Sequence, residues 1–140
     1  MVDEQVIDEQ LAAALDAILT SVYQVKQVSW AAPPSTTREA LEDLKRFLFE
    51  QVQVIGEAEE RIAGRSDSIG SPSSHNRGNL VAEAGGVEAA VEVLADRIAL
   101  LASELRQRRD DIAGSDEAAL LDRAAAGLTE RVKRLVTAAS

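Results

Sequence analysis

Residues 65–79 read RSDSIGSPSSHNRGN, and this stretch decides how the rest of the chain is arranged. Glycine, serine, proline and asparagine dominate it, and no helical periodicity runs through it, so it predicts a loop. A loop of this length is unusual inside a compact helical domain. It is long enough to carry the chain from one end of a helical bundle to the other, which would make the helices before and after it parallel.

Two long helices are expected before this loop, over about residues 3–31 and 37–63. Asp3 suits the start of the first, and Pro33 ends it, because the residue before a proline avoids the helical conformation. Thr36 with Glu39 three residues later predicts a capping box for the second, and Gly64 predicts its C-cap. Apolar residues recur at three- and four-residue steps in both helices: Val6, Leu11, Leu15, Ile18, Leu19, Val22 and Val25, then Leu41, Leu44, Leu48, Val52, Ile55 and Ile62.

Two further helices are expected over about residues 86–113 and 116–138. The connection over residues 64–85 has room for a short helix near Leu80 to Ala84. Gly114 stops the third long helix and Ser115 caps the fourth, and this short link makes the two antiparallel. The sequence therefore predicts an all-α, ferritin-like four-helix bundle, with a long crossover between helices 2 and 3, as a single domain over residues 1–140. The two stripes are Val87, Val91, Leu94, Ile98, Leu101, Leu105 and Ile112, then Leu120, Leu121, Ala124, Leu128, Val132 and Leu135.

Composition narrows the classes of protein to consider. The chain has 140 residues, a formal net charge of −9 and no cysteine. The absence of cysteine fits a reducing compartment, no apolar run approaches the ~18 residues of a membrane helix, and the first ten residues, MVDEQVIDEQ, lack a basic leader. We therefore expect a cytoplasmic protein with no membrane partner. The acidic balance also argues against strong DNA binding, since phosphate contacts need clustered lysine and arginine.

Few side chains suggest chemistry, and no catalytic residue is assigned. The single histidine, His75, lies in the loop, which excludes the Glu-x-x-His pairs of metal-oxidising bundles. Glu57 and Glu60 share a helix face, with Glu50 two turns before Glu57 on roughly that face, and carboxylates suit hard cations such as Mg²⁺ or Ca²⁺. The ordinary interpretation of such a run is a solvated acidic stripe. Trp30, the only tryptophan, is a candidate for core, interface or site lining.

Several stretches, in order and at matching spacing, resemble the Dps family, the miniferritins. Residues 26–30, KQVSW, are similar to the end of that family's first helix, where a metal-binding histidine immediately precedes a tryptophan. Residues 59–62, EERI, with Gly64 after them, resemble its Ala-Glu-Arg run near the end of the second helix. Residues 94–98, LADRI, and 115–122, SDEAALLD, continue the likeness, which covers about residues 5–137.

The resemblance implies a hollow homo-oligomer of twelve subunits that oxidises Fe²⁺ at a site shared between two subunits. The histidine before the tryptophan falls on Ser29, the second histidine on Leu41, and the acidic residue one turn later on Lys45. The aspartate one turn before the last ligand falls on Gly56, and only the last ligand, Glu60, is retained. Because Fe²⁺ needs several nitrogen or oxygen ligands together, we expect the usual oxidation centre to be largely lost.

Three functions follow as alternatives. The first is a Dps-like homo-oligomer without the usual centre, which binds or stores iron at other acidic surfaces or serves as a structural subunit. In it Trp30 resembles an interface residue, and Glu60, with Glu57, is a weak metal ligand. The second is an active Fe(II)-oxidising miniferritin whose site has moved to Glu50, Glu57, Glu60 or acids on the third and fourth helices. The third is a four-helix interaction module with no metal role. Iron is the one cofactor considered.

Overall fold

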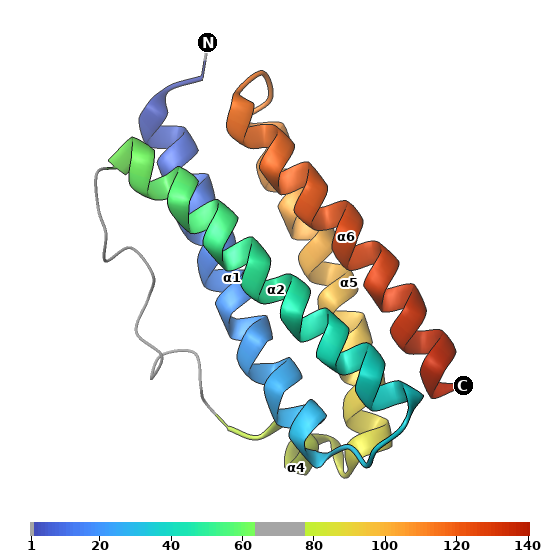
Figure 1. Ribbon diagram of the computed structural model, residues 1–140. Helices are drawn as coiled ribbons and strands as arrows, with labels where there is room; N and C mark the ends of the chain where they lie inside the picture. The colour runs from blue at the N-terminus through green and yellow to red at the C-terminus, as the bar shows by residue number, and fades with distance from the viewer. Residues whose placement is uncertain (1, 64–77) are drawn as a thin grey trace.

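The computed structural model describes residues 2–63 and 78–140, and these form an all-α bundle of four long helices (Figure 1). The long helices are α1 (Glu4–Ala31), α2 (Thr36–Ala63), α5 (Val87–Asp111) and α6 (Asp116–Ala139). A short helix, α4 (Leu80–Ala84), occupies the segment where a short helix is expected. Residues 64–77, which include the Gly64 cap, His75 and most of the predicted loop, lie outside the described residues.

The helices follow the order that the long connection predicts. α1 packs against α2 and α5, and α6 packs against the same two helices. Figure 1 shows α1 and α6 running in one direction and α2 and α5 in the other. The end of α2 and the start of α4 lie at opposite ends of the bundle. The parallel arrangement of α2 and α5 and the antiparallel arrangement of α5 and α6 are therefore confirmed.

Helix starts show both a confirmed pattern and a correction. The Asp3 side chain caps α1 and the Ser115 side chain caps α6, each by accepting a hydrogen bond from a backbone N–H, at 3.1 and 3.2 Å. For α2 the predicted cap at Thr36 is wrong. The hydroxyl of Ser35 accepts the bond from the Arg38 backbone N–H at 3.2 Å. Serine is favoured over threonine at this position, which is the physical reason for the one-residue shift.

The core is built from the apolar stripes of all four long helices. Stripe residues near the edges of the core, such as Val6, Leu19 and Ile62, are only partly buried. Burial of a leucine or isoleucine side chain contributes about 1.5–3 kcal/mol, so the stripes hold the bundle together. The largest fully buried side chains are Leu11, Leu15, Ile18, Leu41, Leu44, Leu48, Ile55, Leu94, Ile98, Leu105, Ile112 and Leu121.

A contact centred on Phe47 fixes α2 against α6. A Cβ atom added at Gly127 would lie 2.1 Å from the ring atom Cζ of Phe47, so the ring packs directly on the α6 backbone. The guanidinium carbon of Arg131 lies 4.0 Å from the centroid of that ring. Asp43, one turn before Phe47, forms ion pairs with Arg131 at 3.4 Å and with Arg134 at 3.5 Å. This side of α2 therefore faces α6.

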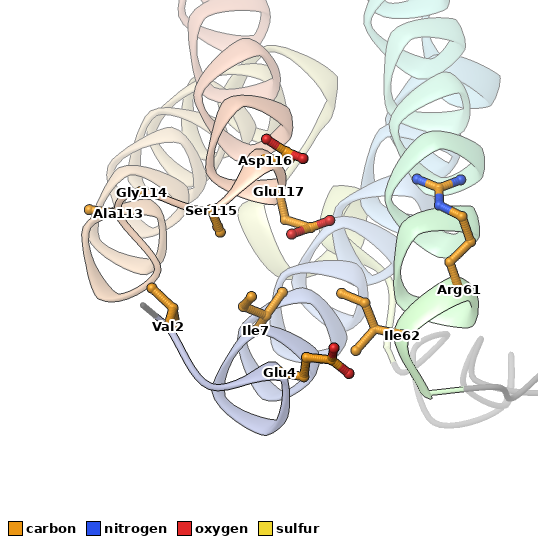
Figure 2. A pocket seen from close by; sticks show the side chains of 10 residues that line it. All are labelled: Val2, Glu4, Ile7, Arg61, Ile62, Ala113, Gly114, Ser115, Asp116 and Glu117. Atoms are coloured by element: carbon orange, nitrogen blue, oxygen red, sulfur yellow. The ribbon is translucent and has the colours of Figure 1, made fainter.

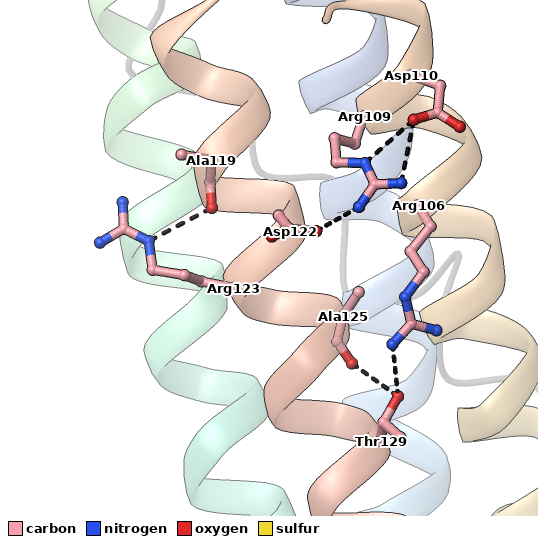
Figure 3. Close-up of polar contacts among 8 residues, drawn as sticks. All are labelled: Arg106, Arg109, Asp110, Ala119, Asp122, Arg123, Ala125 and Thr129. Atoms are coloured by element: carbon pink, nitrogen blue, oxygen red, sulfur yellow. Dashed lines mark hydrogen bonds and ion pairs between the residues drawn. The ribbon is translucent and has the colours of Figure 1, made fainter.

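Polar contacts join α5 to α6 along their shared edge (Figure 3). Arg109 pairs with Asp122 across the two helices and with Asp110 on its own helix. Arg106 donates from Nη2 to the hydroxyl of Thr129 at 2.9 Å. The ion pairs of Arg109 lie near the surface, where such pairs contribute at most about 1 kcal/mol each, so they orient the helices more than they stabilise them.

Candidate functional site

The positions that the resemblance assigns to metal ligands lie along α1 and α2. Ser29 is near the end of α1 and is buried. Lys45, Gly56 and Glu60 follow one side of α2 at steps of eleven and four residues, which return to nearly the same angle on a helix of 3.6 residues per turn. Leu41, four residues before Lys45, lies on the edge of this side that turns toward the core. It is 0% exposed and belongs to the core.

The side of α2 that carries Lys45 and Glu60 is not the side that packs on α6. Asp43 and Phe47 make the contacts with α6. Glu42, one turn before Lys45, bonds to α1 instead. We call the residues Lys45, Phe49, Gly56 and Glu60 the α2 stripe; it borders α1 and faces away from α6.

A polar contact between α1 and α2 occupies the start of this stripe. The hydroxyl of Ser29 donates a hydrogen bond to Oε1 of Glu42, and Nζ of Lys45 lies 2.9 Å from Oε2 of Glu42. The bond from Ser29, and then the bond from Lys45, hold the pKa of Glu42 below its usual range. Both carboxylate oxygens are engaged, and the ammonium fixes a positive charge beside them. This Ser29–Glu42–Lys45 contact is therefore suited to joining two helices and not to holding a metal cation.

Sequence reasoning did not single out Glu42. Its spacing of three residues from Lys45 on one helix is a signal for the ion pair. No signal in the sequence indicates the bond to Ser29, because that bond depends on how α1 and α2 pack.

Replacing Ser29 by alanine is expected to raise the pKa of Glu42 toward its ordinary value of 4.5, since the Ser29 bond is the largest cause of the depression. A depressed carboxyl pKa contributes stability above the unfolded-state pKa, and this stability is lost as pH falls through the folded-state pKa. Ser29→Ala should therefore weaken the dependence of stability on pH on the acid side.

The measurement is an NMR titration of the Glu42 carboxyl carbon in both chains. Ser21→Ala is the matched control, because Ser21 is also buried on α1 but donates to the backbone oxygen of Ala17. A Glu42 pKa that stays the same in Ser29→Ala, or that moves equally in both variants, would contradict the assignment.

The acidic candidates are dispersed. Glu50, Glu57 and Glu60 are exposed on α2. Over residues 2–63 and 78–140, no group of three or more histidine, aspartate or glutamate side chains is placed to hold a metal ion. Glu59, which sequence reasoning passed over, is fully buried. Its place four residues after the core residue Ile55 is the signal that indicates this burial.

Large apolar side chains are exposed along α1 and α2. Trp30 is 68% exposed and Phe49 is 46% exposed. The ammonium of Lys26 lies 5.0 Å from the centroid of the Trp30 ring. Trp30 is therefore not a core residue, and its assignment to a subunit interface stays a prediction.

A cavity of about 560 Å³ lies at the end of the bundle where α1 begins and α5 turns into α6 (Figure 2). Its charged lining consists of Glu4, Arg61, Asp116 and Glu117, and Val2, Ile7 and Ile62 supply apolar walls. Ser115 also lines it, but its hydroxyl is used to cap α6. Glu50, Glu57, Glu60 and Trp30 do not line this cavity. Asp116 and Glu117 are acids of the fourth long helix, but they belong to no group of three or more possible metal ligands among the described residues.

Comparison with protein-family models, with curated proteins and with solved structures finds no match for this chain. Among the helices of the described residues, none has both the length and the apolar character needed to span a bilayer. The likeness to the Dps family rests on the residues quoted from the sequence.

Proposed function

We propose that this chain is a self-associating, Dps-like subunit with a ferritin-like bundle, in which structural contacts have replaced the family's iron-oxidation centre. The Ser29–Glu42–Lys45 contact is the observation that carries the proposal. The carboxylate of Glu42 is already bonded and the ammonium of Lys45 is already paired, whereas an oxidation centre would need unoccupied metal ligands there.

The residues present do not fit Fe²⁺ as a substrate at this place. The hydroxyl of Ser29 is committed to Glu42, and Leu41 offers no ligand atom and is buried in the core. Lys45 repels a cation. Gly56 has no side chain, which leaves the single carboxylate of Glu60, and one carboxylate is a weak site for Fe²⁺. These residues therefore do not support oxidation of Fe²⁺ at this place.

Self-association is supported by the two exposed aromatic side chains on α1 and α2. Trp30 and Phe49 are of the residue class that anchors protein interfaces, because they bury a large area at a low cost in side-chain entropy. The surface of the assembly would still attract iron or other cations, since each chain has a formal net charge of −9 and such a charge raises the local cation concentration. Iron binding of this kind is part of the proposal.

The test adds Fe²⁺ and oxygen to the purified protein and follows ferric absorbance beside a protein-free control. We expect the rate to equal that of the control. A rate well above the control that is lost in Glu60→Ala would overturn the proposal in favour of an active, relocated centre. Light scattering coupled to chromatography gives the mass in the same preparation. A mass of 15.0 kDa, that of one chain, would favour a monomeric interaction module instead.

A further inference from the structure

We propose that the cavity at the end of the bundle where α1 begins binds a small zwitterion with an apolar side chain, namely a free apolar amino acid or a dipeptide. The carboxylate of this ligand pairs with Arg61, and its ammonium pairs with Glu117 and Glu4. The inference goes beyond the proposed function, since it uses none of the residues on which that proposal rests.

Four charged side chains of both signs line this cavity. Arg61 lies in the last turn of α2, and Glu117 lies in the first turn of α6. Glu4 and Asp116 add two further carboxylates, from the first turns of α1 and α6. Figure 2 shows the Glu117 side chain directed toward the space between α6 and α2, with Arg61 on the other side of that space. The cavity is therefore cationic at α2 and anionic at the starts of α1 and α6.

These charges do not neutralise one another through direct contact. In the part of the chain that the structure describes, the Arg61 guanidinium forms no ion pair or hydrogen bond, and the carboxylates of Glu4, Asp116 and Glu117 form none either. Each charge stabilises its own helix, since acids favour the start of a helix and bases its end. That effect does not require the four to surround one cavity, whereas a ligand that carries both charges uses both sides of it.

The apolar part of the lining accommodates the side chain of the ligand. Ile7 is 6% exposed and belongs to the core, and Val2 and Ile62 are half-buried. A hydrocarbon group that contacts them leaves water, which contributes about 25 cal/mol per Å² of apolar surface. The volume of about 560 Å³ lies within the range of roughly 300–1,000 Å³ that small-molecule sites occupy.

The combination of charges selects the zwitterion over simpler ligands. A ligand with only a positive charge is repelled by Arg61, and a ligand with only a negative charge is repelled by three carboxylates. Arg61 presents a planar fork of N–H donors that matches a carboxylate, and an ammonium has three donors that Glu117 and Glu4 can accept. An amino acid or a dipeptide carries both groups together with an apolar side chain.

The test titrates the full chain with leucine and with leucyl-leucine and follows the methyl signals of Ile7 and Ile62 by NMR. Both signals should move and saturate, whereas the methyl signals of Leu100, which is exposed on α5 and does not line the cavity, should stay in place. Leucinamide lacks the carboxylate and N-acetyl-leucine lacks the ammonium. Each should bind about tenfold or more weakly than leucine, because each leaves one side of the cavity without its charged partner.

Two variants assign each charge to one side of the cavity. Arg61→Gln should weaken leucine binding about tenfold or more and leave leucinamide binding unchanged, because leucinamide has no carboxylate to lose. Glu117→Gln should weaken leucine binding and leave N-acetyl-leucine binding unchanged or tighter. Arg123→Gln is the matched control, since Arg123 is exposed, bonds to the backbone of its own helix and does not line the cavity. Circular dichroism shows that each variant keeps its helices.

The outcomes decide the inference without bearing on the proposed function, which is tested by mass and by ferric absorbance. Tighter binding of leucine or of leucyl-leucine shows which spacing of the two charges the cavity fits, and either result supports the inference. Methyl signals that do not saturate with either ligand up to about 10 mM would overturn it. Leucinamide or N-acetyl-leucine binding as tightly as leucine, or equal weakening by Arg61→Gln and Arg123→Gln, would overturn the pairing of both charges.

Discussion

Gly127→Ala is expected to lower the free energy of unfolding by about 1–3 kcal/mol, the range for forcing an extra carbon into a packed contact. Helix propensity acts in the other direction, because alanine is better than glycine in a helix interior by roughly 1 kcal/mol. Packing should win. The added Cβ would lie 2.1, 2.7 and 2.9 Å from three atoms of the Phe47 ring, all closer than real Cβ contacts. Arg131, with its guanidinium carbon 4.0 Å from the ring centroid, restricts where the ring can move.

The sign of the effect should reverse when the ring is removed. In a Phe47→Ala background the same Gly127→Ala substitution meets no ring, so only propensity remains and stability should rise by up to about 1 kcal/mol. Urea unfolding followed by circular dichroism measures all four chains of this cycle. Gly56→Ala, studied in dilute solution, is the matched control, since a Cβ atom at that glycine meets no atom of the described residues within 4 Å. A neutral or stabilising Gly127→Ala in the chain that keeps Phe47 would contradict the packing argument.

The helices and their order follow from local signals in the sequence. The period of the apolar residues predicts the four long helices, and the position of the long loop predicts that α2 and α5 are parallel. Ser35 shows where such signals become ambiguous, because it and Thr36 are both acceptable caps and differ by one residue. At Gly127 local signals in the sequence do not predict the packing. A glycine within a helical pattern is locally only a weak helix former, and its role depends on a ring far away in the sequence.

The sequence likewise predicts some features of the candidate site and not others. The sequence predicts that Leu41 is apolar core, because it belongs to the stripe of the second helix, and the structure confirms this burial. It does not predict the bond from Ser29 to Glu42, or that a Cβ atom at Gly56 would meet no atom of the described residues within 4 Å. Both depend on how helices pack around each residue, and neither leaves a trace in residue spacing.

Leu41→His is expected to lower the free energy of unfolding by about 2.5–6 kcal/mol at neutral pH. Two effects add. Loss of a fully buried leucine costs about 1.5–3 kcal/mol, and an imidazole buried without a hydrogen-bond partner costs about 1–3 kcal/mol. Leu41 is 0% exposed and is surrounded by the apolar core, so neither water nor a surface acceptor can relieve the second cost. Leu41→Met keeps the volume and should cost less than about 1.5 kcal/mol.

The pH dependence separates burial of the imidazole from simple loss of packing. Burial disfavours the charged form, so the pKa of the introduced histidine should lie below its unfolded-state value of about 6.5. The unfolded chain then binds more protons, and stability must decrease as pH falls below about 6.5. Urea unfolding at pH 8 and at pH 5.5 should show a loss for Leu41→His that deepens at the lower pH and a loss for Leu41→Met that does not. Equal, pH-independent losses in both variants would contradict the burial of this position.

This prediction bears on function because Leu41 is where the resemblance places a metal-binding histidine. If the histidine is as costly as expected, the family's ligand set cannot be restored one residue at a time. A histidine at Leu41 would lie in the core without a metal to bond it, while Lys45 remained paired with Glu42. Ser29, Leu41 and Lys45 would have to change together before Fe²⁺ could compensate for the buried imidazole. Core packing would then keep this surface of α1 and α2 without an oxidation centre and available for contact with a second copy of the chain.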